Sequence, residues 1–308
     1  MSQPSSLSAA PVRVAAAAGV SAPRGEPVRG VSAEATVHPT AVVEDGASVA
    51  AGAFVGPWCH VGPDVVVEAG ARLMSHVVVD GVTRIGEAAV LFPFCTVGMV
   101  PQDLKYRGEP TRCEIGARTQ VREHCSVHRG TVTGTGITRV GADCLLMAVV
   151  HVAHDCALGD GVIVANNVVM GGHVTIGARA VIGGASALHQ FVRVGRMAMV
   201  GGVTGVEADV IPFGRVIGNR AHLAGLNLVG LQRSGVDKAG QQRLLAAFRA
   251  LFPRSLDGVA VYAERLGQVR AEQGGDPLVA EVLAFLDAPS GRGVIGASTR
   301  REDDGKEG

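Results

Sequence analysis

The histidines are the residues of this sequence best suited to chemistry, since ten occur in a chain of 308 residues that has only two tyrosines. His151, His154, His173 and His189 fall within one short stretch, and Asp155 follows His154 directly. A neutral imidazole beside a carboxylate suits general base catalysis near pH 7, because its ordinary pKa keeps both protonation states accessible. Adjacent residues point to opposite sides of a regular strand, so contact between His154 and Asp155 requires a corner or a bulge there.

Residues in this stretch recur at intervals of eighteen positions. Three triplets follow one another at that spacing: Ala153-His154-Asp155, Gly171-Gly172-His173 and His189-Gln190-Phe191. If eighteen residues form one structural repeat, the triplets stack into a single patch, with His151 just around the preceding corner. Gly172 then leaves room above His154, where a tetrahedral oxyanion can approach a backbone N–H. The alternative is a set of solvated surface histidines, which a stacked patch beside a glycine pair disfavours.

A six-residue period supplies the elements that position these residues. Every sixth residue is aliphatic from Val37 to Val97, Ile115, Val121 and Val127 keep the same phase, and a third run extends from Val140 to Val206. One inward aliphatic residue, small residues at the bend and polar residues outside make one short strand and one corner, so three hexads close a triangular coil of eighteen residues. Coils stack at about 4.8 Å, which places residues eighteen apart one above the other. This pattern resembles the hexapeptide-repeat transferases, and the resemblance implies an all-β left-handed parallel β-helix.

Proline and glycine mark where the repeat is interrupted, and helical signals follow its end. Pro101 and Pro110 lie in one interruption, and three glycines and a one-residue phase slip lie in the other. After Pro212 we expect helices over 236–252, from Ser255 and from Asp276. The predicted organisation is a disordered extension (1–30), a β-helix (31–212) with excursions at 99–114 and 128–139, a small α-helical domain (213–288) and a polar tail (289–308).

The composition excludes several classes of protein. The formal net charge is zero, so no chain-wide field would recruit nucleic acid or an anionic membrane. No run of eighteen apolar residues exists, which excludes a transmembrane helix. The six cysteines include no C-x-x-C pair and no secretory signal precedes them, so we expect reduced, mostly buried thiols and a cytoplasmic protein.

Longer motifs narrow the resemblance to one family. The segments QDLKYRGEPT, HRGT, LLMAVVHVAHDC, GGHVTIG, IGGASALHQF and MVGGVTGV, between residues 37 and about 287, resemble the bacterial acyl-carrier-protein:UDP-N-acetylglucosamine O-acyltransferases. That family catalyses the first step of lipid A synthesis. The resemblance implies transfer of a 3-hydroxyacyl group from acyl carrier protein to the 3-hydroxyl of UDP-N-acetylglucosamine by a homotrimer with its sites between subunits.

The resemblance also implies a role for each candidate residue. His154 would be the general base, Asp155 would support its imidazole, and the Gly172 N–H would hold the oxyanion. Gly202 would leave the acyl groove open and so favour a long chain of about fourteen carbons, because each buried methylene is worth about 0.8 kcal/mol. The implied substrate-binding residues are Gln102, Asp103, Lys105, His151, His173, His189, Gln190, Asn227 and Arg233.

Some features depart from the family, and some alternatives remain. Val229 and Ser234 replace an acidic and a basic residue of the family, which puts nucleotide contacts there in doubt. The N-acyltransferase of the same pathway shares fold and donor, but it carries a uridine-binding domain that 36 N-terminal residues cannot form. A non-catalytic scaffold predicts no histidine patch. Hexapeptide-repeat carbonic anhydrases bind zinc with two histidines five residues apart, a spacing that the close pairs here lack, so we expect no metal or other cofactor.

Overall fold

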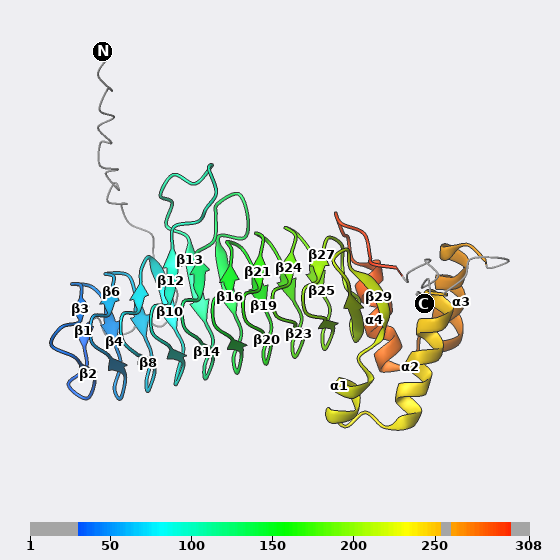
Figure 1. Cartoon of the computed structure of the whole chain (residues 1–308), viewed down its shortest axis with the longest axis horizontal. Helices are drawn as coiled ribbons and strands as arrows, with labels where there is room; N and C mark the ends of the chain where they lie inside the picture. The colour runs from blue at the N-terminus through cyan, green and yellow to red at the C-terminus, as the bar shows by residue number, and fades with distance from the viewer. Residues whose placement is uncertain (1–29, 254–259, 297–308) are drawn as a thin grey trace, which may run out of the picture.

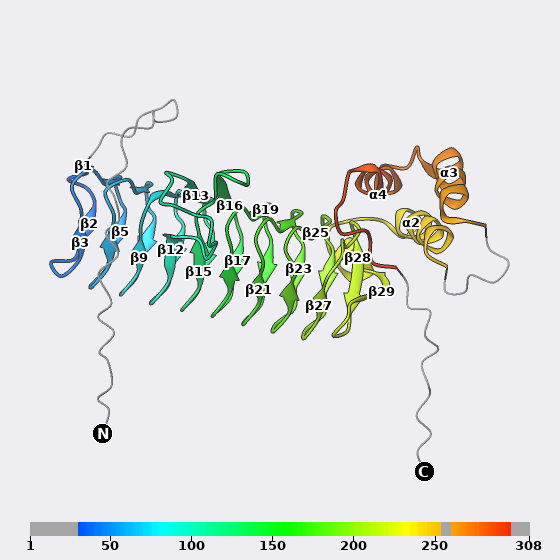
Figure 2. The same cartoon turned by 90° about the horizontal axis from the view of Figure 1, so that it is seen from above.

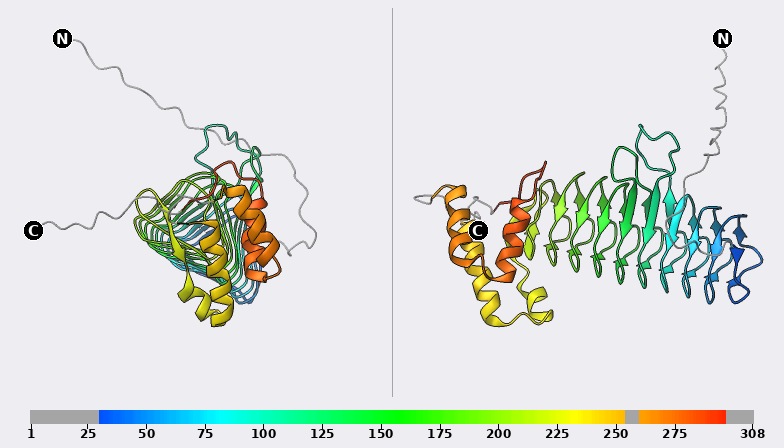
Figure 3. Two further views of the ribbon diagram at one scale, coloured as in Figure 1. Left: turned by 90° about the vertical axis from the view of Figure 1, so that its right-hand side faces the viewer. Right: turned by 180° about the vertical axis from the view of Figure 1, so that it is seen from behind.

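The computed structural model describes residues 30–253 and 260–296. The predicted disordered extension, except for Gly30, lies outside the described residues, as do Ser255 and the last part of the predicted polar tail. The described chain forms a long triangular prism of stacked coils with helices at one end (Figure 1). Viewed along its axis, the prism shows three walls around a narrow interior (Figure 3).

Three parallel sheets, here called A, B and C, form the walls of the prism. Sheet A contains β1 (Gly30–Val31), β4 (Ser48–Val49), β7 (Val66–Val67), β10 (Val82–Ile85), β13 (Arg112–Ile115), β16 (Ile137–Val140), β19 (Ala157–Leu158), β22 (Thr175–Ile176) and β25 (Arg193–Val194). Sheet B contains β2 (Thr36–Val37), β5 (Phe54–Val55), β8 (Arg72–Leu73), β11 (Val90–Leu91), β14 (Gln120–Val121), β17 (Leu145–Leu146), β20 (Ile163–Val164), β23 (Val181–Ile182), β26 (Met199–Val200), β28 (Gly214–Ile217) and β29 (His222–Leu226). Sheet C contains β3 (Val42–Val43), β6 (His60–Val61), β9 (Val78–Val79), β12 (Thr96–Met99), β15 (Ser126–His128), β18 (His151–Val152), β21 (Val169–Met170), β24 (Ala187–Leu188) and β27 (Gly205–Val206).

The strand register confirms the eighteen-residue coil. Val49 pairs with Val67 and Val152 pairs with Met170, each eighteen residues further along. The second residue of nearly every short strand is the aliphatic hexad position, and these side chains fill the interior from Val49 to Val206 with almost no exposed surface. All six cysteines are also buried, and none forms a disulfide, as expected.

Two loops leave the prism where the repeat was expected to break. Residues 100–111 connect β12 to β13, and residues 129–136 connect β15 to β16. Both rise side by side from the same edge of the prism (Figure 1). The coil offset grows to thirty residues between Ile85 and Ile115, and to twenty-five between Val127 and Val152, before the regular stacking resumes.

The last coil carries the helices. The helices are α1 (Leu228–Arg233), α2 (Lys238–Leu251), α3 (Tyr262–Gln273) and α4 (Pro277–Asp287). Helix α4 begins as predicted, because Asp276 caps its N-terminus and Pro277 occupies its first turn. The helices gather at one end of the prism, where α4 lies beside the last coils (Figure 2), and Arg196 of the prism pairs with Glu281 of α4 at 2.6 Å. No helix in the described part of the chain is long and apolar enough to cross a membrane.

Residues after α4 return to the prism. Val294 forms a parallel bridge with Asp209, and Ile295 is buried against the prism core. The buried Asp209 carboxylate also accepts a 2.6 Å hydrogen bond from Arg193 Nε. The described part of the segment assigned to a polar tail therefore covers the end of the prism.

Candidate active site

The predicted pair of His154 and Asp155 is in direct contact. His154 Nδ1 lies 2.9 Å from Asp155 Oδ2, and the Asp155 side chain is fully buried. The contact is possible because the two residues occupy the corner between sheets C and A, here called the C–A corner, where Asp155 adopts φ +59°. Asp155 N–H also donates to Thr138 Oγ1 at 2.8 Å, which fixes the turn.

The loop of residues 129–136 forms a cradle for the Asp155 carboxylate. Thr131 donates its backbone N–H to both oxygens and its hydroxyl to Oδ2 at 2.7 Å, and Gly136 N–H and the Thr135 hydroxyl reach Oδ1 at 3.1 Å. Burial alone would raise the pKa of Asp155, but hydrogen bonds from Thr131, His154 and Thr135 outweigh it, so the pKa lies below its ordinary value. Asp155 is therefore a carboxylate at neutral pH.

Gly172 lies directly against the imidazole of His154, as the eighteen-residue map predicted. A Cβ on Gly172 would lie 2.5 Å from Cε1 and 2.7 Å from Nε2 of His154. No side chain can occupy this position without moving the histidine. Within the described residues, the Gly172 N–H also has no protein acceptor. The missing side chain thus makes room for the His154 imidazole beside an N–H that has no acceptor among the described residues.

His173 completes the inner part of the site. Its ring lies edge-on to His154 with centroids 5.0 Å apart, and it stacks on Phe191 at 4.4 Å. Its Nδ1 is 3.9 Å from Asp155 Oδ2. Burial lowers the pKa of His173; the charges of Asp155 and Asp103 act in the opposite direction, and those of His154 and Lys105 act with burial.

His151 is close to this group but is held by a different residue. Its Nδ1 lies 2.7 Å from Ser126 Oγ, and its ring packs edge-on to His128 with centroids 4.8 Å apart. Burial, together with the neighbouring charge of His154, lowers the pKa of His151. His128 is more buried still: burial, His151 and His154 lower its pKa to about 4, and its Nδ1 has no partner among the described residues.

The loop of residues 100–111 brings two predicted sugar contacts to the same corner. Asp103 accepts a 2.9 Å hydrogen bond from the Lys105 N–H, and both charges act on His173. Gln102 is exposed in the same loop. The topology thus places this loop beside the histidines, although more than forty residues separate them in sequence.

His189 and Gln190 occupy the coil above Gly172. His189 is exposed, with Nδ1 3.3 Å from the carbonyl oxygen of Gln190. That carbonyl also accepts a 2.8 Å hydrogen bond from Arg292 Nε, in the segment that returns after α4. Gln190 packs its Cγ over Gly171, where a Cβ would lie 3.1 Å away.

Asn227 and Arg233 lie away from these residues on a single chain. Asn227 caps α1 by accepting from Gly230 N–H at 3.0 Å, and its amide donates to the carbonyl of Met197, at the corner between sheets A and B. Arg233 is exposed in the last turn of the same helix. One chain therefore does not bring this pair to His154.

Gly202 lies on the opposite edge of sheet C, at the corner between sheets B and C, here called the B–C corner. A Cβ there would meet Gly184 O at an ordinary 3.4 Å, and a Cβ on Gly184 would meet Asn166 O at 3.3 Å. By contrast, a Cβ on Gly183 or Gly201 would lie under 3 Å from the next coil. Corner geometry therefore requires Gly183 and Gly201, but it does not require Gly202.

His154, Asp155 and His173 could in principle hold a metal, because one ligand atom of each lies within 4.8 Å of the others. The hydrogen bonds argue against it. Both oxygens of Asp155 already accept from N–H or O–H groups of Thr131, Thr135 and Gly136. A metal would have to displace these donors, so the donor set fits a buried hydrogen-bonded carboxylate better than a ligand.

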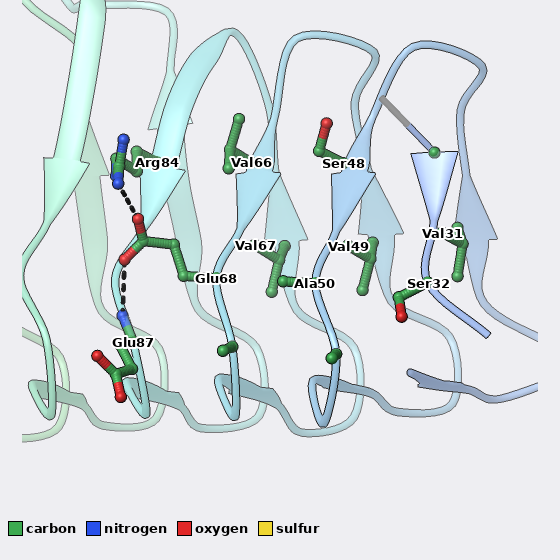
Figure 4. Close-up of a pocket in the computed structure, with 13 residues that line it drawn as sticks. Val31, Ser32, Ser48, Val49, Ala50, Val66, Val67, Glu68, Arg84 and Glu87 are labelled. Carbon is green, nitrogen blue, oxygen red and sulfur yellow. Dashed lines mark hydrogen bonds and ion pairs between the residues drawn. The ribbon is translucent and has the colours of Figure 1, made fainter. Parts of the chain in front are cut away.

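The histidine corner is partly exposed to solvent in one chain, since 16% of the His154 side chain and 20% of the His173 side chain are accessible. A cavity of about 700 Å³ lies instead on the outer face of sheet A, near its N-terminal end, between Val31, Ser48, Val66, Glu68 and Arg84 (Figure 4). Valine, alanine and serine line most of it, and the Glu68 carboxylate is already engaged by Arg84 and by the Glu87 N–H. It contains none of the predicted site residues.

These features define a class of protein. The chain is a parallel β-helix of hexapeptide repeats in which a histidine at one corner contacts a buried carboxylate, as in the hexapeptide-repeat transferases. The family model described as "Bacterial transferase hexapeptide (six repeats)" matches residues 137–172. The model described as "Udp N-acetylglucosamine O-acyltransferase; Domain 2" matches residues 209–295.

Curated relatives and solved structures identify the family. The acyl-(acyl-carrier-protein)–UDP-N-acetylglucosamine O-acyltransferase of Azorhizobium caulinodans is 48% identical over 84% of this chain and 94% of its own length. The protein of the same name from Rhizobium johnstonii is 43% identical over 86% of this chain and 96% of its own. A crystal structure of a UDP-N-acetylglucosamine acyltransferase superposes with a TM-score of 0.81, at 35% identity, over 85% of this chain and 99% of that chain.

The chain belongs to the family of acyl-(acyl-carrier-protein)–UDP-N-acetylglucosamine O-acyltransferases and is an enzyme. The predicted fold class is confirmed as well: a left-handed parallel β-helix with a small C-terminal helical part.

Proposed function

We propose that this enzyme transfers a 3-hydroxyacyl group from acyl carrier protein to the 3-hydroxyl of UDP-N-acetylglucosamine, with His154 as general base. The names of the curated relatives support the substrates. The contact between His154 Nδ1 and the buried Asp155 carboxylate supports the mechanism. The cytoplasmic location expected from the sequence is part of the same proposal.

The contact with Asp155 sets the tautomer of His154. A carboxylate only accepts hydrogen bonds, so the ring proton of neutral His154 lies on Nδ1 and the lone pair lies on Nε2. Nε2 lies beside Gly172, and 16% of the His154 side chain is exposed to solvent. This arrangement presents a base, already correctly oriented, to a hydroxyl group that enters from outside the corner.

The reaction then balances without a covalent enzyme intermediate. Nε2 of His154 takes the proton of the sugar 3-hydroxyl while the oxygen of that hydroxyl attacks the carbonyl carbon of the thioester. The negative charge that develops on the carbonyl oxygen is stabilised by the Gly172 N–H, and the imidazolium is stabilised by Asp155. The carbon–sulfur bond breaks, the carrier thiolate leaves and takes the proton from His154, and the products are the sugar ester and the carrier thiol.

The remaining predicted residues bind substrate in this proposal. His151, His173, His189 and Gln190 would line the sugar and acyl pocket around the base. Gln102, Asp103 and Lys105 would reach the sugar and phosphates from the adjacent loop, and Asn227 with Arg233 would hold the nucleotide end.

A homotrimer would close the site, and two features of the chain support it. Six large apolar side chains on sheet C and its B–C corner are between 48% and 72% exposed: Val42, Trp58, Phe94, Val149, Val169 and Val203. A stripe of this kind on one side of a protein favours association. The histidines and Gly202 also occupy opposite edges of sheet C, so a groove connecting them requires a second chain.

Gly202 would set the length of that groove. It lies three coils from His154, which is roughly 14 Å along the prism axis. Because its backbone would accept a side chain without a clash, the absence of one leaves space for the acyl chain. We propose that this space favours long 3-hydroxyacyl donors.

One experiment tests the reaction. The purified enzyme is incubated with UDP-N-acetylglucosamine and a set of 3-hydroxyacyl carrier proteins, and the product is identified by mass. An O-acyl ester of UDP-N-acetylglucosamine, cleaved by mild base, is expected. Acylation of an amino-sugar nucleotide to a base-stable amide, with no acylation of UDP-N-acetylglucosamine, would point to the N-acylating alternative. His154→Ala should lower kcat by about 10² to 10⁴ with little change in KM, because the base acts only as the transition state forms. Retention of more than half of wild-type kcat would rule out His154 as the base.

The trimer is tested separately by sedimentation. The expected mass is three times the 31.5 kDa of the chain. Trp58→Glu should shift the enzyme towards monomers and lower activity with them. A monomeric wild-type enzyme with full activity would contradict the proposal.

A further inference from the structure

Arg129 lies one coil below His154 on the C–A corner. Val127 pairs with Val152 in adjacent coils. Two residues further along each coil, Arg129 therefore lies beneath His154. The Arg129 N–H donates to Met99 O at 3.1 Å, and the N–H of the following Gly130 donates to Arg112 O at 3.0 Å. These two hydrogen bonds hold both ends of the loop of residues 100–111.

The Arg129 side chain reaches the middle of the same loop. Its guanidinium carbon lies 5.7 Å from the centre of the Tyr106 ring. Gly81 makes room for it, because a Cβ there would collide with Nη1. Within residues 30–253 and 260–296, its buried Nε has no hydrogen-bond partner and its guanidinium forms no ion pair. Because no carboxylate among the described residues pairs with this cation, the Tyr106 ring can help to orient it by attracting the guanidinium.

Tyr106 connects this contact to the predicted sugar-binding residues. Its hydroxyl donates to Glu109 O at 2.6 Å, and its N–H donates to Asp103 O at 3.0 Å. Asp103 in turn accepts from the Lys105 N–H. Displacement of the Tyr106 ring would therefore move the turn that carries both charged side chains.

We propose that Arg129 is a positioning residue, which holds the loop of residues 100–111 over the histidine corner through its contact with Tyr106. Asp103 and Lys105 are thereby kept where they meet the acceptor sugar nucleotide. The role assigned to these two residues rests on the proposed function, whereas the position of the loop does not.

The first test measures the loop directly. Trypsin cleaves after Lys105 and Arg107, both exposed in the loop, and the fragments are followed by mass. Arg129→Met keeps the length of the side chain but removes its charge, and we expect cleavage at these sites at least five-fold faster than in wild type. The matched control is Arg72→Met, since Arg72 places its guanidinium 4.7 Å from the Phe54 ring on sheet B. The control should leave cleavage in the loop unchanged.

The second test measures the substrate. Arg129→Met should raise KM for UDP-N-acetylglucosamine about three- to thirty-fold, while kcat and KM for the acyl donor stay within about two-fold. A role confined to stability would lower activity and melting temperature without separating the two KM values. If Arg129→Met does not fold, Tyr106→Leu removes the other partner of the contact and should give the same separation.

A double-mutant cycle decides whether the effect acts through Tyr106. Tyr106→Leu should reproduce the change seen in Arg129→Met, and the double variant should be no worse than either single one. Fully multiplicative effects, or wild-type cleavage and acceptor KM in Arg129→Met, would overturn the proposal. Faster cleavage of Arg129→Met in an enzyme that forms no acyl product would reject the proposed reaction and leave the positioning role standing.

Discussion

Asp155→Asn separates the role of the carboxylate from its shape, because asparagine has nearly the same size. The N–H groups of Gly136 and Thr131 both point at the Oδ1 position, whereas the Thr131 N–H alone points at Oδ2, so an amide nitrogen meets fewer opposing donors at Oδ2. The amide therefore prefers the Oδ2 position, where Thr131 Oγ1 and His154 Nδ1 can both accept from it. In that orientation His154 must carry its proton on Nε2, which blocks the base.

Two contributions set the size of the expected loss. A hydrogen bond to a charged group contributes about 1.5–3 kcal/mol and a neutral one about 1, so the imidazolium loses about 0.5–2 kcal/mol of stabilisation, or roughly 2- to 30-fold in rate. The wrong tautomer adds to this, and the corresponding substitution in a serine protease lowers kcat about 10⁴-fold. We expect kcat of Asp155→Asn to fall by about 10² to 10⁴, with both KM values within about three-fold.

The assay compares kcat and both KM values with a matched variant. Asp160→Asn makes the same substitution at a corner remote from the histidines, where Asp160 Oδ1 accepts from the Ala142 N–H at 2.8 Å. Melting temperature and sedimentation check that both variants fold and assemble. The tautomer argument fails if Asp155→Asn keeps more than about one third of wild-type kcat, or if the two variants lose the same amount.

Three further outcomes follow from the structure. Arg249→Glu, on an exposed part of α2, should raise KM for the acyl carrier protein and weaken the salt dependence of that KM. Arg179→Glu, on an exposed part of the prism, should change neither quantity. An unchanged KM in Arg249→Glu would exclude docking of the carrier protein on α2. His128 has a folded pKa of about 4 against an ordinary value near 6.5, so the unfolded chain binds more protons between these values and stability falls as pH drops from 6.5 to 4, by about 3 kcal/mol. Urea unfolding should show that His128→Asn lacks this loss, and equal pH slopes would contradict it. Gly202→Met should shift the products towards shorter acyl chains, read by mass, and an unchanged distribution would show that the length limit lies elsewhere.

The choice of residues for the docking test comes from the structure. Residues 215–254 hold seven Lys and Arg residues against one acid, Asp237, so the sequence favours this segment as a surface for the acidic carrier protein. Arg243, however, pairs at 2.7 Å with Asp276, the residue that caps α4. Reversing its charge would disturb the cap as well as the surface, so Arg249 gives the cleaner test.

The fold could be predicted from the sequence because its period is local. One aliphatic residue in six determines each strand, and Val61, Ile176 and Val194 are as buried as the repeat requires. The histidine patch could be predicted from the same repeat, because stacking at eighteen-residue intervals places Gly172 against His154, as the structure shows. Helix α1 was missed because a helix of six residues has too few turns to show a periodic pattern.

The partners of Asp155 could not be predicted, because they belong to a loop without a period. Thr131, Thr135 and Gly136 reach the carboxylate only through the conformation of residues 129–136. The available signal was composition: the sequence HRGTVTGTG is rich in small hydroxyl residues and glycine. A Cβ on Gly134 would collide with the Asp155 carboxylate and the His173 ring, so at least one of these glycines is there to let the loop approach the site.

The same loop distinguishes this corner from the many similar ones along the prism. Asp155 and His173 have φ near +60°, a conformation that is costly for most side chains. Arg179, Ala185 and Met197 share it at corners without any predicted role, so the strain belongs to the architecture and not to catalysis. What distinguishes the C–A corner is the loop that leaves the prism one coil below and returns its N–H and hydroxyl groups to a carboxylate. Shortening that loop should therefore abolish the base while leaving the stacked coils, and their positive φ angles, in place.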